Sequence, residues 1–326
     1  MDQKITIIIP FFNAQSTVIQ TIESLFAQSF LFNQLVIVND ASTDDSLKKV
    51  KDFLTSKKFF IKKHSINIVF IDHKKSRGLA YSYNDGIKHS KSQIVVTLHA
   101  DIILKKNSLK NLIQPFFSKD SNSVVATSHC VIHPFEVWSK YNFWQKCFFS
   151  RLVRKKYCGL DGKFDGFSRQ TLLDVGLFDY KNFRTAGEDG DIICKLKKIG
   201  SLVSTKAEII HIHQASKKFG FKDIAKKQAQ YSEAQGTMMR RGVIRNPKEI
   251  FRAFFREFLL LGLLLPYVRF LSLAIIVVYA FSYTWLVFTK EFKNPRIIIL
   301  PLLNIYLLFV SIVYSTKGLI YGKQKI

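Results

Sequence analysis

The first hundred residues contain four short apolar runs separated by segments with helical spacing. The runs cover residues 5–9, 35–38, 67–71 and 94–98 and consist mainly of Ile, Val and Leu. Between them, apolar residues recur three and four positions apart, as on one face of a helix. Apolar strands that alternate with helices are typical of parallel sheets covered on both faces. The pattern therefore predicts an α/β fold with a doubly wound, mostly parallel, Rossmann-like sheet.

Polar residues follow three of these runs closely. Asn13 comes after the first run, Asp40 after the second and Asp101 after the fourth. In open α/β sheets ligands bind at the carboxyl ends of the strands, so these side chains are predicted to share one crevice. As an alternative, a carboxylate such as Asp40 caps the following helix. Neither GxGxxG nor GxxxxGK[ST] is present, which argues against a dinucleotide fingerprint and a P-loop.

The C-terminal fifth contains two apolar stretches without a charge, residues 270–289 and 297–315. Each is long enough to cross a bilayer core of about 30 Å as a helix, and the polar turn between them predicts a hairpin. A buried pair of soluble helices is the alternative. We therefore expect an α/β domain over residues 1–235, a basic amphipathic or interfacial segment over 236–266, and a transmembrane hairpin with a short basic tail over 267–326.

The chain is strongly basic, with 49 Lys and Arg against 24 Asp and Glu and a formal net charge of +25. A group of these basic residues lies among phenylalanines between positions 240 and 258, which is typical of a helix on an anionic membrane surface. The positive-inside tendency places the α/β domain in the cytosol. No zinc-finger spacing, RNP motif or recognition-helix pattern accompanies the charge, so no nucleic-acid partner is predicted.

The cysteines give a prediction about the redox compartment. Cys130, Cys147, Cys158 and Cys194 fit neither a CxxC motif nor the dense spacing of a disulfide framework. This distribution favours reduced thiols in a reducing compartment.

Six short motifs give the chain a resemblance to a known family. They are IIIPFFN at 7–13, VIVNDASTD at 36–44, RG at 77–78 with NDG at 84–86, LHAD at 98–101, GLFD at 176–179 and GEDGD at 187–191. In order and rough spacing they resemble the family 2 glycosyltransferases with the GT-A fold, along most of residues 5–215. The resemblance implies an enzyme that transfers a sugar from a nucleotide-diphosphate donor.

The resemblance also implies a divalent cation, Mn²⁺ or Mg²⁺, that neutralises the leaving diphosphate as a Lewis acid. Asp101 is the implied ligand. Family members commonly have a DxD triplet here, whereas this chain has His99, Ala100 and Asp101, which looks like a known variant. A neutral His99 would coordinate the metal or contact the donor; a structural, hydrogen-bonded histidine is the alternative. His211 and His213 follow a strand-like segment, and the resemblance implies that one of them helps to hold metal or diphosphate, with a structural role as the alternative.

Residues at the strand ends are implied to bind the donor. Asp40 resembles the family's base reader, a carboxylate that accepts a hydrogen bond from an imide N–H of the nucleobase. Arg77 either approaches the diphosphate or belongs to a solvated basic run. The other implied donor-binding residues are Pro10, Phe11, Asn13 and Ala100.

The acceptor hydroxyl must lose a proton as it attacks. Asp189 resembles the family's catalytic base, with Glu188 beside it, while Asp191 orients the acceptor or caps a helix over residues 191–198. One base without a second nucleophile implies a single displacement with inversion at the anomeric carbon. Trp138 and Trp144 lie in an aromatic and basic segment that suits acceptor contacts; an ordinary aromatic core helix is the alternative.

These residues predict an inverting transferase that moves a single sugar to a membrane-associated, lipid-linked or glycan acceptor in cell-surface polysaccharide or glycolipid synthesis. We expect it at the cell membrane, with the catalytic domain on the cytoplasmic face. A processive polysaccharide synthase is an alternative, although the stretch at 228–233 lacks the Trp of the chain-binding motif. A polyprenyl-phosphate sugar transferase and an inactive membrane scaffold with the same fold are further alternatives.

Overall fold

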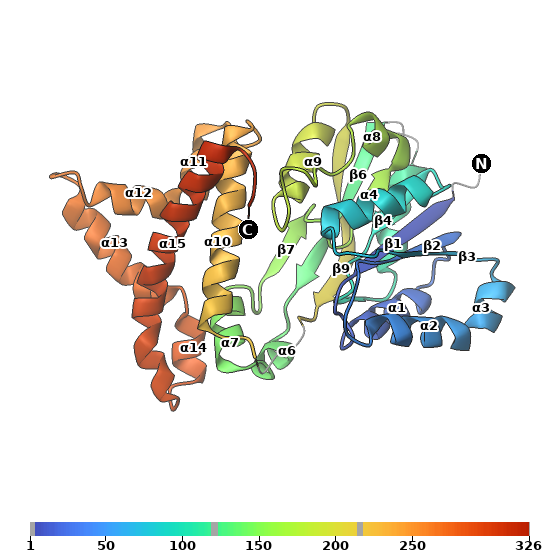
Figure 1. Cartoon of the computed structure of the whole chain (residues 1–326), viewed down its shortest axis with the longest axis horizontal. Helices are drawn as coiled ribbons and strands as arrows, with labels where there is room; N and C mark the ends of the chain where they lie inside the picture. The colour runs from blue at the N-terminus through green and yellow to red at the C-terminus, as the bar shows by residue number, and fades with distance from the viewer. Residues whose placement is uncertain (1–3, 119–122, 214–217, 326) are drawn as a thin grey trace. The chain divides into compact units, whose positions relative to one another are not determined.

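The computed structural model describes residues 4–118, 123–213 and 218–325 (Figure 1). The chain forms two compact units that are interleaved along the sequence. The first, which we call the sheet unit, comprises Met1–His133, Lys155–Tyr180 and Glu188–Gln214. The second, the helical unit, comprises Pro134–Arg154, Lys181–Gly187 and Ala215–Ile326. Three segments that the sequence assigned to the α/β domain, residues 134–154, 181–187 and 218–235, thus pack with the C-terminal helices instead.

The sheet unit is built on one nine-stranded sheet of order β3-β2-β1-β4-β8-β6-β9-β5, with β7 paired to β6. Its first half is parallel, because β1 pairs in parallel with β2 and β4, and β2 with β3. In the second half β6 and β9 are parallel, whereas β5, β7 and β8 run antiparallel to their neighbours. The strands are β1 (Ile5–Phe11), β2 (Gln34–Asn39), β3 (Asn67–Asp72), β4 (Ile94–Thr97), β5 (Ile102–Leu104), β6 (Val124–Ile132), β7 (Lys156–Gly159), β8 (Gly166–Ser168) and β9 (Ser201–His211).

Helices cover both faces of this sheet, as the strand–helix alternation predicts. They are α1 (Val18–Phe26), α2 (Ser46–Ser56), α3 (Lys58–Lys63), α4 (Leu79–His89), α5 (Ser108–Ile113), η1 (Gln114–Phe117), α8 (Arg169–Asp174) and α9 (Glu188–Leu196). Helix α9 begins at Glu188, three residues before the predicted start at Asp191. Asp191 therefore lies in the first turn and pairs with Lys195 at 2.7 Å rather than capping the helix.

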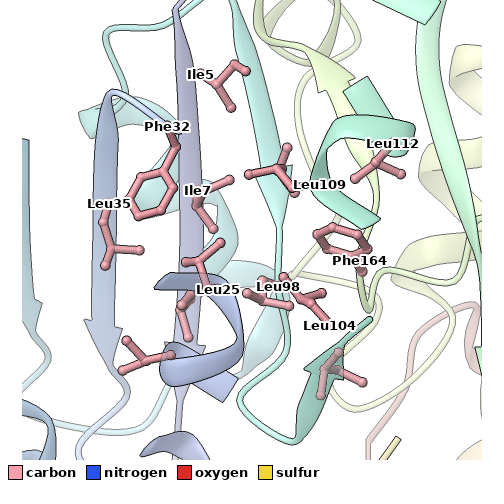
Figure 2. Packing of buried hydrophobic residues seen from close by; sticks show 14 of the residues in the cluster. Ile5, Ile7, Leu25, Phe32, Leu35, Leu98, Leu104, Leu109, Leu112 and Phe164 are labelled. Carbon is pink, nitrogen blue, oxygen red and sulfur yellow. The ribbon is translucent and has the colours of Figure 1, made fainter. Parts of the chain in front are cut away.

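Alternation along β1 divides the core between the two faces. Ile5 and Ile7 point into one apolar cluster (Figure 2), to which Ile9 also belongs. Ile8 instead points into a second cluster beneath α4. The contact between α4 and β1 requires a glycine, since a Cβ on Gly86 would lie 2.4 Å from the Cγ2 of Ile8. This close packing explains the glycine of the NDG motif and confirms the predicted doubly wound arrangement.

The helical unit contains α6 (Phe135–Ser139), α7 (Phe143–Phe149), α10 (Phe221–Arg240), α11 (Pro247–Ala253), α12 (Phe255–Gly262), α13 (Arg269–Ser282), α14 (Trp285–Lys290), η3 (Pro295–Ile299) and α15 (Leu300–Tyr321). Helices α10 and α15 pack backbone against backbone at two glycines. A Cβ on Gly236 would lie 1.9 Å from the carbonyl oxygen of Ser315, and one on Gly318 would lie 2.0 Å from that of Glu233. Larger side chains would force these helices apart.

Of the two predicted membrane spans, the structure forms one as a continuous helix. Residues Pro295–Tyr321 are the one helical stretch, among the described residues, that is long and apolar enough to cross a bilayer. The other stretch is interrupted between α13 and α14. The side-chain amide of Asn304 donates to the carbonyl of Ala280 at 2.7 Å and to Thr284 Oγ1 at 3.0 Å, so the carbonyl that Thr284 N would use in a regular helix is occupied. The predicted hairpin of two full spans is therefore wrong in its first half.

The cysteines also differ from the prediction. Cys130 on β6 and Cys158 on β7 face each other in the antiparallel register and form a disulfide, whereas Cys147 and Cys194 are free. Sequence spacing missed this pair because a single bridge across neighbouring strands depends on the strand register rather than on a local motif. The expectation that all four thiols are reduced is corrected accordingly.

Candidate active site

The carboxyl ends of β1 and β4 border a cavity of about 210 Å³. It is lined by Pro10, Phe11, Phe12, Asn13, Ala14, Thr17, Leu79, His99, Ala100 and Asp101. Six of the residues predicted to bind donor or metal thus line one pocket, because both strands run in the same direction and end at the same edge of the sheet.

Asn13 ties the ends of β1 and β2 together. It adopts a positive φ of 48°, a conformation that asparagine tolerates better than most residues. Its side-chain oxygen accepts a hydrogen bond from Thr43 N at 2.8 Å, and its own N–H donates to Ser42 Oγ at 3.0 Å. The motif residues after both strands therefore form a single hydrogen-bonded rim of the pocket.

Asp40 is buried and organises the loop that follows β3. Its carboxylate accepts hydrogen bonds from Ser76 Oγ at 2.7 Å and from the backbone N–H groups of Arg77 and Gly78 at 2.9 Å. Burial alone would raise its pKa, but the hydrogen bonds from His73 and this loop outweigh burial and hold the pKa below its ordinary value. Both carboxylate oxygens are thus engaged by the protein, and a contact with a nucleobase stays a prediction.

His73 is a site residue that sequence reasoning missed. Its Nδ1 lies 2.9 Å from Asp40 and its Nε2 lies 3.0 Å from Asp85, so it links β2, the following loop and α4. The Arg77 guanidinium stacks 3.4 Å from the ring centre of Tyr81. Nothing in the local pattern marks His73, since its partners are brought near by the parallel pairing of β2 and β3.

Asp101 sits between β4 and β5 next to two histidines. The Nε2 of His211 donates to Asp101 Oδ2 at 3.0 Å, and the Nδ1 of His99 lies 3.9 Å from Asp101 Oδ1. Burial would raise the pKa of Asp101, but the charge and hydrogen bond of His211 outweigh it and lower this pKa. Burial lowers the pKa of His99 to about 4, so His99 is neutral at physiological pH. Asp101 Oδ1 and His99 Nε2 are both buried and have no hydrogen-bond partner among the described residues.

His211 also belongs to a second group with His133 and His213. One ring nitrogen from each of the three lies within 4.8 Å of the other two. Burial lowers the pKa of His133 to about 4 and that of His213 well below its usual range. The sequence indicated His211 and His213 as neighbours, but it gave no sign of His133, which comes from a different strand.

Two side-chain pairs that the sequence did not indicate involve β6 and the loop before β8. His129 on β6 lies 3.0 Å from Asp165, and Lys163 lies 2.5 Å from Asp161. The loop that carries these acidic residues continues the pairing of β4, because the N–H of His99 donates to the carbonyl of Lys163 at 2.9 Å. The loop therefore holds the backbone of the HAD triplet in place.

Glu188 and Asp189 stand at the first turn of α9. Burial, together with the charge of Asp189, raises the pKa of Glu188 to about 7, and burial raises that of Asp189. Burial raises the pKa of Tyr83 well above its ordinary value, and the negative charges of Asp165, Asp101 and Glu188 raise it further. Tyr83, a further residue that the sequence did not indicate, stacks on His99 with ring centres 6.1 Å apart, and its hydroxyl donates to the carbonyl of Gly162 at 3.1 Å. A carboxylate with a raised pKa in a closed site suits general-base chemistry.

The two predicted acceptor-side tryptophans belong to the helical unit. Trp138 is only 2% exposed and its Nε1 donates to the carbonyl of Lys146 at 3.0 Å, so the core alternative describes it and its ring offers no free face to a sugar. Trp144 is half-buried and packs edge-on against Phe143 and Phe221. An acceptor contact by Trp144 or Asp191 stays a prediction.

Comparison with known proteins places this geometry among sugar-transferring enzymes. A family model described as glycosyl transferase family 2 matches residues 6–169. The chain is 25% identical over 126 residues to glycosyltransferase GlyG of Streptococcus pneumoniae serotype 4, covering 38% of this chain and 39% of that protein. It is 22% identical over 181 residues to the poly-beta-1,6-N-acetyl-D-glucosamine synthase of Staphylococcus epidermidis, covering 54% and 42%. The matches span less than half the length of these curated relatives.

Solved structures share the fold at low sequence identity. The mannosyltransferase PcManGT from Pyrobaculum calidifontis, in complex with GDP-Man and Mn²⁺, superposes with a TM-score of 0.59 at 15% identity, covering 97% of this chain and 88% of that one. GalNAc-T7 with UDP, GalNAc and Mn²⁺ superposes with a TM-score of 0.51 at 16% identity, covering 77% and 54%. These likenesses confirm the predicted GT-A fold.

Proposed function

We propose a reaction for this chain from the premise that it belongs to glycosyl transferase family 2, whose model matches half of its length. The chain transfers a single sugar from a nucleotide-diphosphate donor to an acceptor hydroxyl, with inversion at the anomeric carbon. The observation that carries the proposal is the convergence of two elements: the strand-end pocket with Asp101, and the Glu188–Asp189 pair with its raised pKa values.

A divalent cation fits the residues at Asp101. The Oδ1 of Asp101 and the Nε2 of His99 are buried atoms without hydrogen-bond partners in the described chain, and carboxylate oxygen and neutral imidazole nitrogen are both ligands for Mn²⁺. Two structural neighbours carry Mn²⁺, which supports the same class of ion here. When bound, the ion supplies charge neutralisation for the leaving diphosphate. Asp101 and His99 would hold it.

The donor would lie along the rim formed by Pro10, Phe11, Asn13 and Ala100. Asp40 keeps the loop at 73–78 in place and offers an acceptor oxygen to a base imide, in addition to the hydrogen bonds that it already accepts. Arg77 lies on the same loop, and its positive charge would stabilise the negatively charged diphosphate of the donor.

Asp189 would take the proton from the acceptor hydroxyl as that oxygen attacks the anomeric carbon. Burial raises its pKa above the ordinary value, which favours proton uptake. Glu188 stands beside it in the first turn of α9. With no second carboxylate nucleophile assigned, a single in-line displacement accounts for the inverted product.

The helical unit supports a membrane setting and, with it, a lipid-linked or glycan acceptor. Helix α15 with η3 is long and apolar enough to cross a bilayer. Its neighbours carry large apolar side chains on their outer surface, including Tyr267 at 99% exposure and Phe270 at 68%. We propose that this surface contacts lipid, with the sheet unit on the cytoplasmic face as the basic segment favours.

A calorimetric titration of the full-length protein in detergent tests the reaction class. UDP, dTDP and GDP are titrated with and without Mn²⁺, for the natural chain and for Asp101→Asn. We expect one nucleotide to bind in a Mn²⁺-dependent manner and the variant to lose this binding. Folded protein that binds none of the three, or an Asp101→Asn variant that binds as well as the natural chain, would contradict the proposal.

A further inference from the structure

The segment that follows α15 reaches back to the loop that precedes Glu188. Helix α15 ends at Tyr321, and the next residue, Gly322, adopts a positive φ of 62°, which ends the helix and redirects the chain. Two residues later, Gln324 is only 6% exposed. Glutamine is mostly exposed in folded proteins, so its burial in this tail (residues 322–325) indicates a specific partner.

The side chain of Gln324 satisfies three consecutive N–H groups in the loop of residues 181–187. Its Oε1 accepts hydrogen bonds from the N–H groups of Arg184 and Thr185, each at 2.8 Å, and from that of Ala186 at 3.3 Å. Backbone N–H groups outside a helix or sheet need another partner. Three successive N–H groups directed at one atom form a nest that favours a negatively polarised acceptor. Gln324 supplies this acceptor for the loop.

Helix α10 holds the tail on its other side. The side-chain amide of Gln324 donates to the carbonyl of Gln230 at 2.9 Å, and the N–H of Lys325 donates to Glu233 Oε2 at 3.0 Å. The N–H of Gln324 also donates to the carbonyl of Asn182 at 2.8 Å. The tail therefore ties the loop of residues 181–187 to α10, and all of these contacts lie within the helical unit.

This loop leads directly to the carboxylates of the proposed reaction. Gly187 adopts a positive φ of 95°, and a Cβ there would lie 2.8 Å from the Cδ1 of Phe183 and 3.3 Å from the Cβ of Ala234 on α10. Phe183 is fully buried, so the loop is packed as well as hydrogen-bonded. Glu188 and Asp189 are the next two residues and begin α9. Because the chain is continuous, a shift of Gly187 would move the first turn of α9.

We propose that Gln324 is a positioning residue for sugar transfer, because it holds the loop that presents Asp189 to the acceptor hydroxyl. The inference rests on the proposed role of Asp189 as the general base. A general base must lie within hydrogen-bond reach of the proton that it takes, and a misplacement of about 1 Å costs about 10²-fold in rate. Gln324 acts through the backbone of residues 184–187 rather than on the substrate.

Hydrogen exchange of the full-length protein in detergent tests the hold of Gln324 on the loop without any sugar donor. Gln324→Ala removes the acceptor of the three N–H groups, so amide exchange of residues 184–191 should become about tenfold faster. Lys323→Ala changes an exposed side chain of the same tail and is the matched control, with exchange as in the natural chain. Gln324→Glu keeps an acceptor oxygen, and a charged acceptor binds N–H groups more strongly, so its exchange should stay slow. Unchanged exchange in Gln324→Ala would overturn the proposal.

Sugar transfer then separates positioning from a purely structural role. The nucleotide among UDP, dTDP and GDP that binds with Mn²⁺ defines the hexose donor, and a total membrane lipid extract supplies the acceptor. In Gln324→Ala the single-turnover rate constant should fall about 10–100-fold, while the Kd of the nucleotide stays the same, and Gln324→Glu should restore the rate.

Two results would overturn the positioning role. The first is faster exchange in Gln324→Ala with an unchanged rate constant, and the second is an equal loss of rate in Gln324→Ala and Gln324→Glu. A natural chain that binds none of the three nucleotides would instead reject the proposed reaction and with it the role in transfer, while the exchange experiment would still show whether Gln324 anchors the loop.

Discussion

The two units of the molecule place polar and apolar side chains in opposite ways. The sheet unit buries ionisable groups within its sheet, as in the pair of His129 with Asp165, both almost fully buried. The helical unit instead presents large apolar side chains outward, and most of the exposed large apolar residues belong to it. The difference implies that the sheet unit depends on protonation and bound ions, whereas the helical unit depends on an apolar surrounding and on close helix packing.

The largest expected effect, on the rate of sugar transfer, comes from a substitution that removes one carboxylate from the sheet unit. Asp189→Asn should lower sugar transfer by about 10²–10⁴-fold, because the acceptor hydroxyl loses its general base, while Mn²⁺-dependent nucleotide binding persists. Single-turnover transfer and calorimetry measure the two quantities separately. Asp174→Asn, which changes an exposed carboxylate of α8, is the matched control. If Asp189→Asn transferred sugar as fast as the natural chain, Asp189 would not be the general base.

A single methyl group should break the packing of the helical unit. Gly236→Ala places a Cβ 1.9 Å from the Ser315 carbonyl oxygen, so α10 and α15 must separate, at a cost of about 1–3 kcal/mol. Thermal unfolding in detergent reports the loss. Gly220→Ala at the start of α10 meets no atom closer than 3.9 Å and should melt near the natural chain. Equal melting temperatures for the two variants would mean that these helices are not in close contact.

The same substitution in each unit sharpens the contrast in surface character. Phe270→Ser in the helical unit should weaken binding to anionic vesicles about tenfold, since roughly 1.5–3 kcal/mol accompanies burial of a large apolar side chain and Phe270 is 68% exposed. Phe59→Ser in the sheet unit, at 81% exposure, should leave vesicle binding unchanged. Flotation assays compare the two variants. Equal effects would show that exposure alone, rather than the unit, governs membrane binding.

The smallest expected effect concerns pH. The folded chain holds the Glu188 proton up to a pKa of about 7, whereas the ordinary value is 4.5. The folded state therefore binds more protons between these pH values, and its stability falls as pH rises through this window.

Glu188→Gln removes this titration. We expect the variant to melt a few degrees above the natural chain at pH 8, at about 2–4 °C for each kcal/mol, and the difference to vanish toward pH 4. Glu23→Gln, an exposed site on α1, is the control and should show no such trend. If the difference in melting temperature between Glu188→Gln and the natural chain did not change with pH, Glu188 would not be the group with the raised pKa.

Local patterns carried most of the predicted fold. The four apolar runs each became a strand, and two of the three predicted polar residues after them, Asn13 and Asp101, line one pocket, because parallel strands end at the same edge. Asp40 is not among the residues that line this pocket and is instead hydrogen-bonded to the loop after β3. The features that the sequence did not indicate are those that depend on pairing between strands far apart in the chain. The disulfide of Cys130 with Cys158 and the neighbourhood of His133 and His211 both follow from strand register, which periodicity does not encode.

The broken span shows a second limit of the same kind. Residues 270–289 carry no charge and predict one helix, yet the side-chain amide of Asn304, in the next segment along the chain, donates to the backbone carbonyl of Ala280 within this stretch. Composition measures whether a segment can cross a membrane. It does not reveal where another helix interrupts the hydrogen-bond ladder.

The interleaving of the two units has a consequence for how the chain is made. Lys146, next to the core of the helical unit, pairs with Glu291, which lies 145 residues later. At a synthesis rate of about 5–20 residues per second, the aromatic residues around α7 wait roughly 7–30 s for their partners. During that interval the newborn polypeptide exposes Phe148 and Phe149, which later belong to the core. Cellular production should therefore respond strongly to holdase chaperones and to the speed of translation.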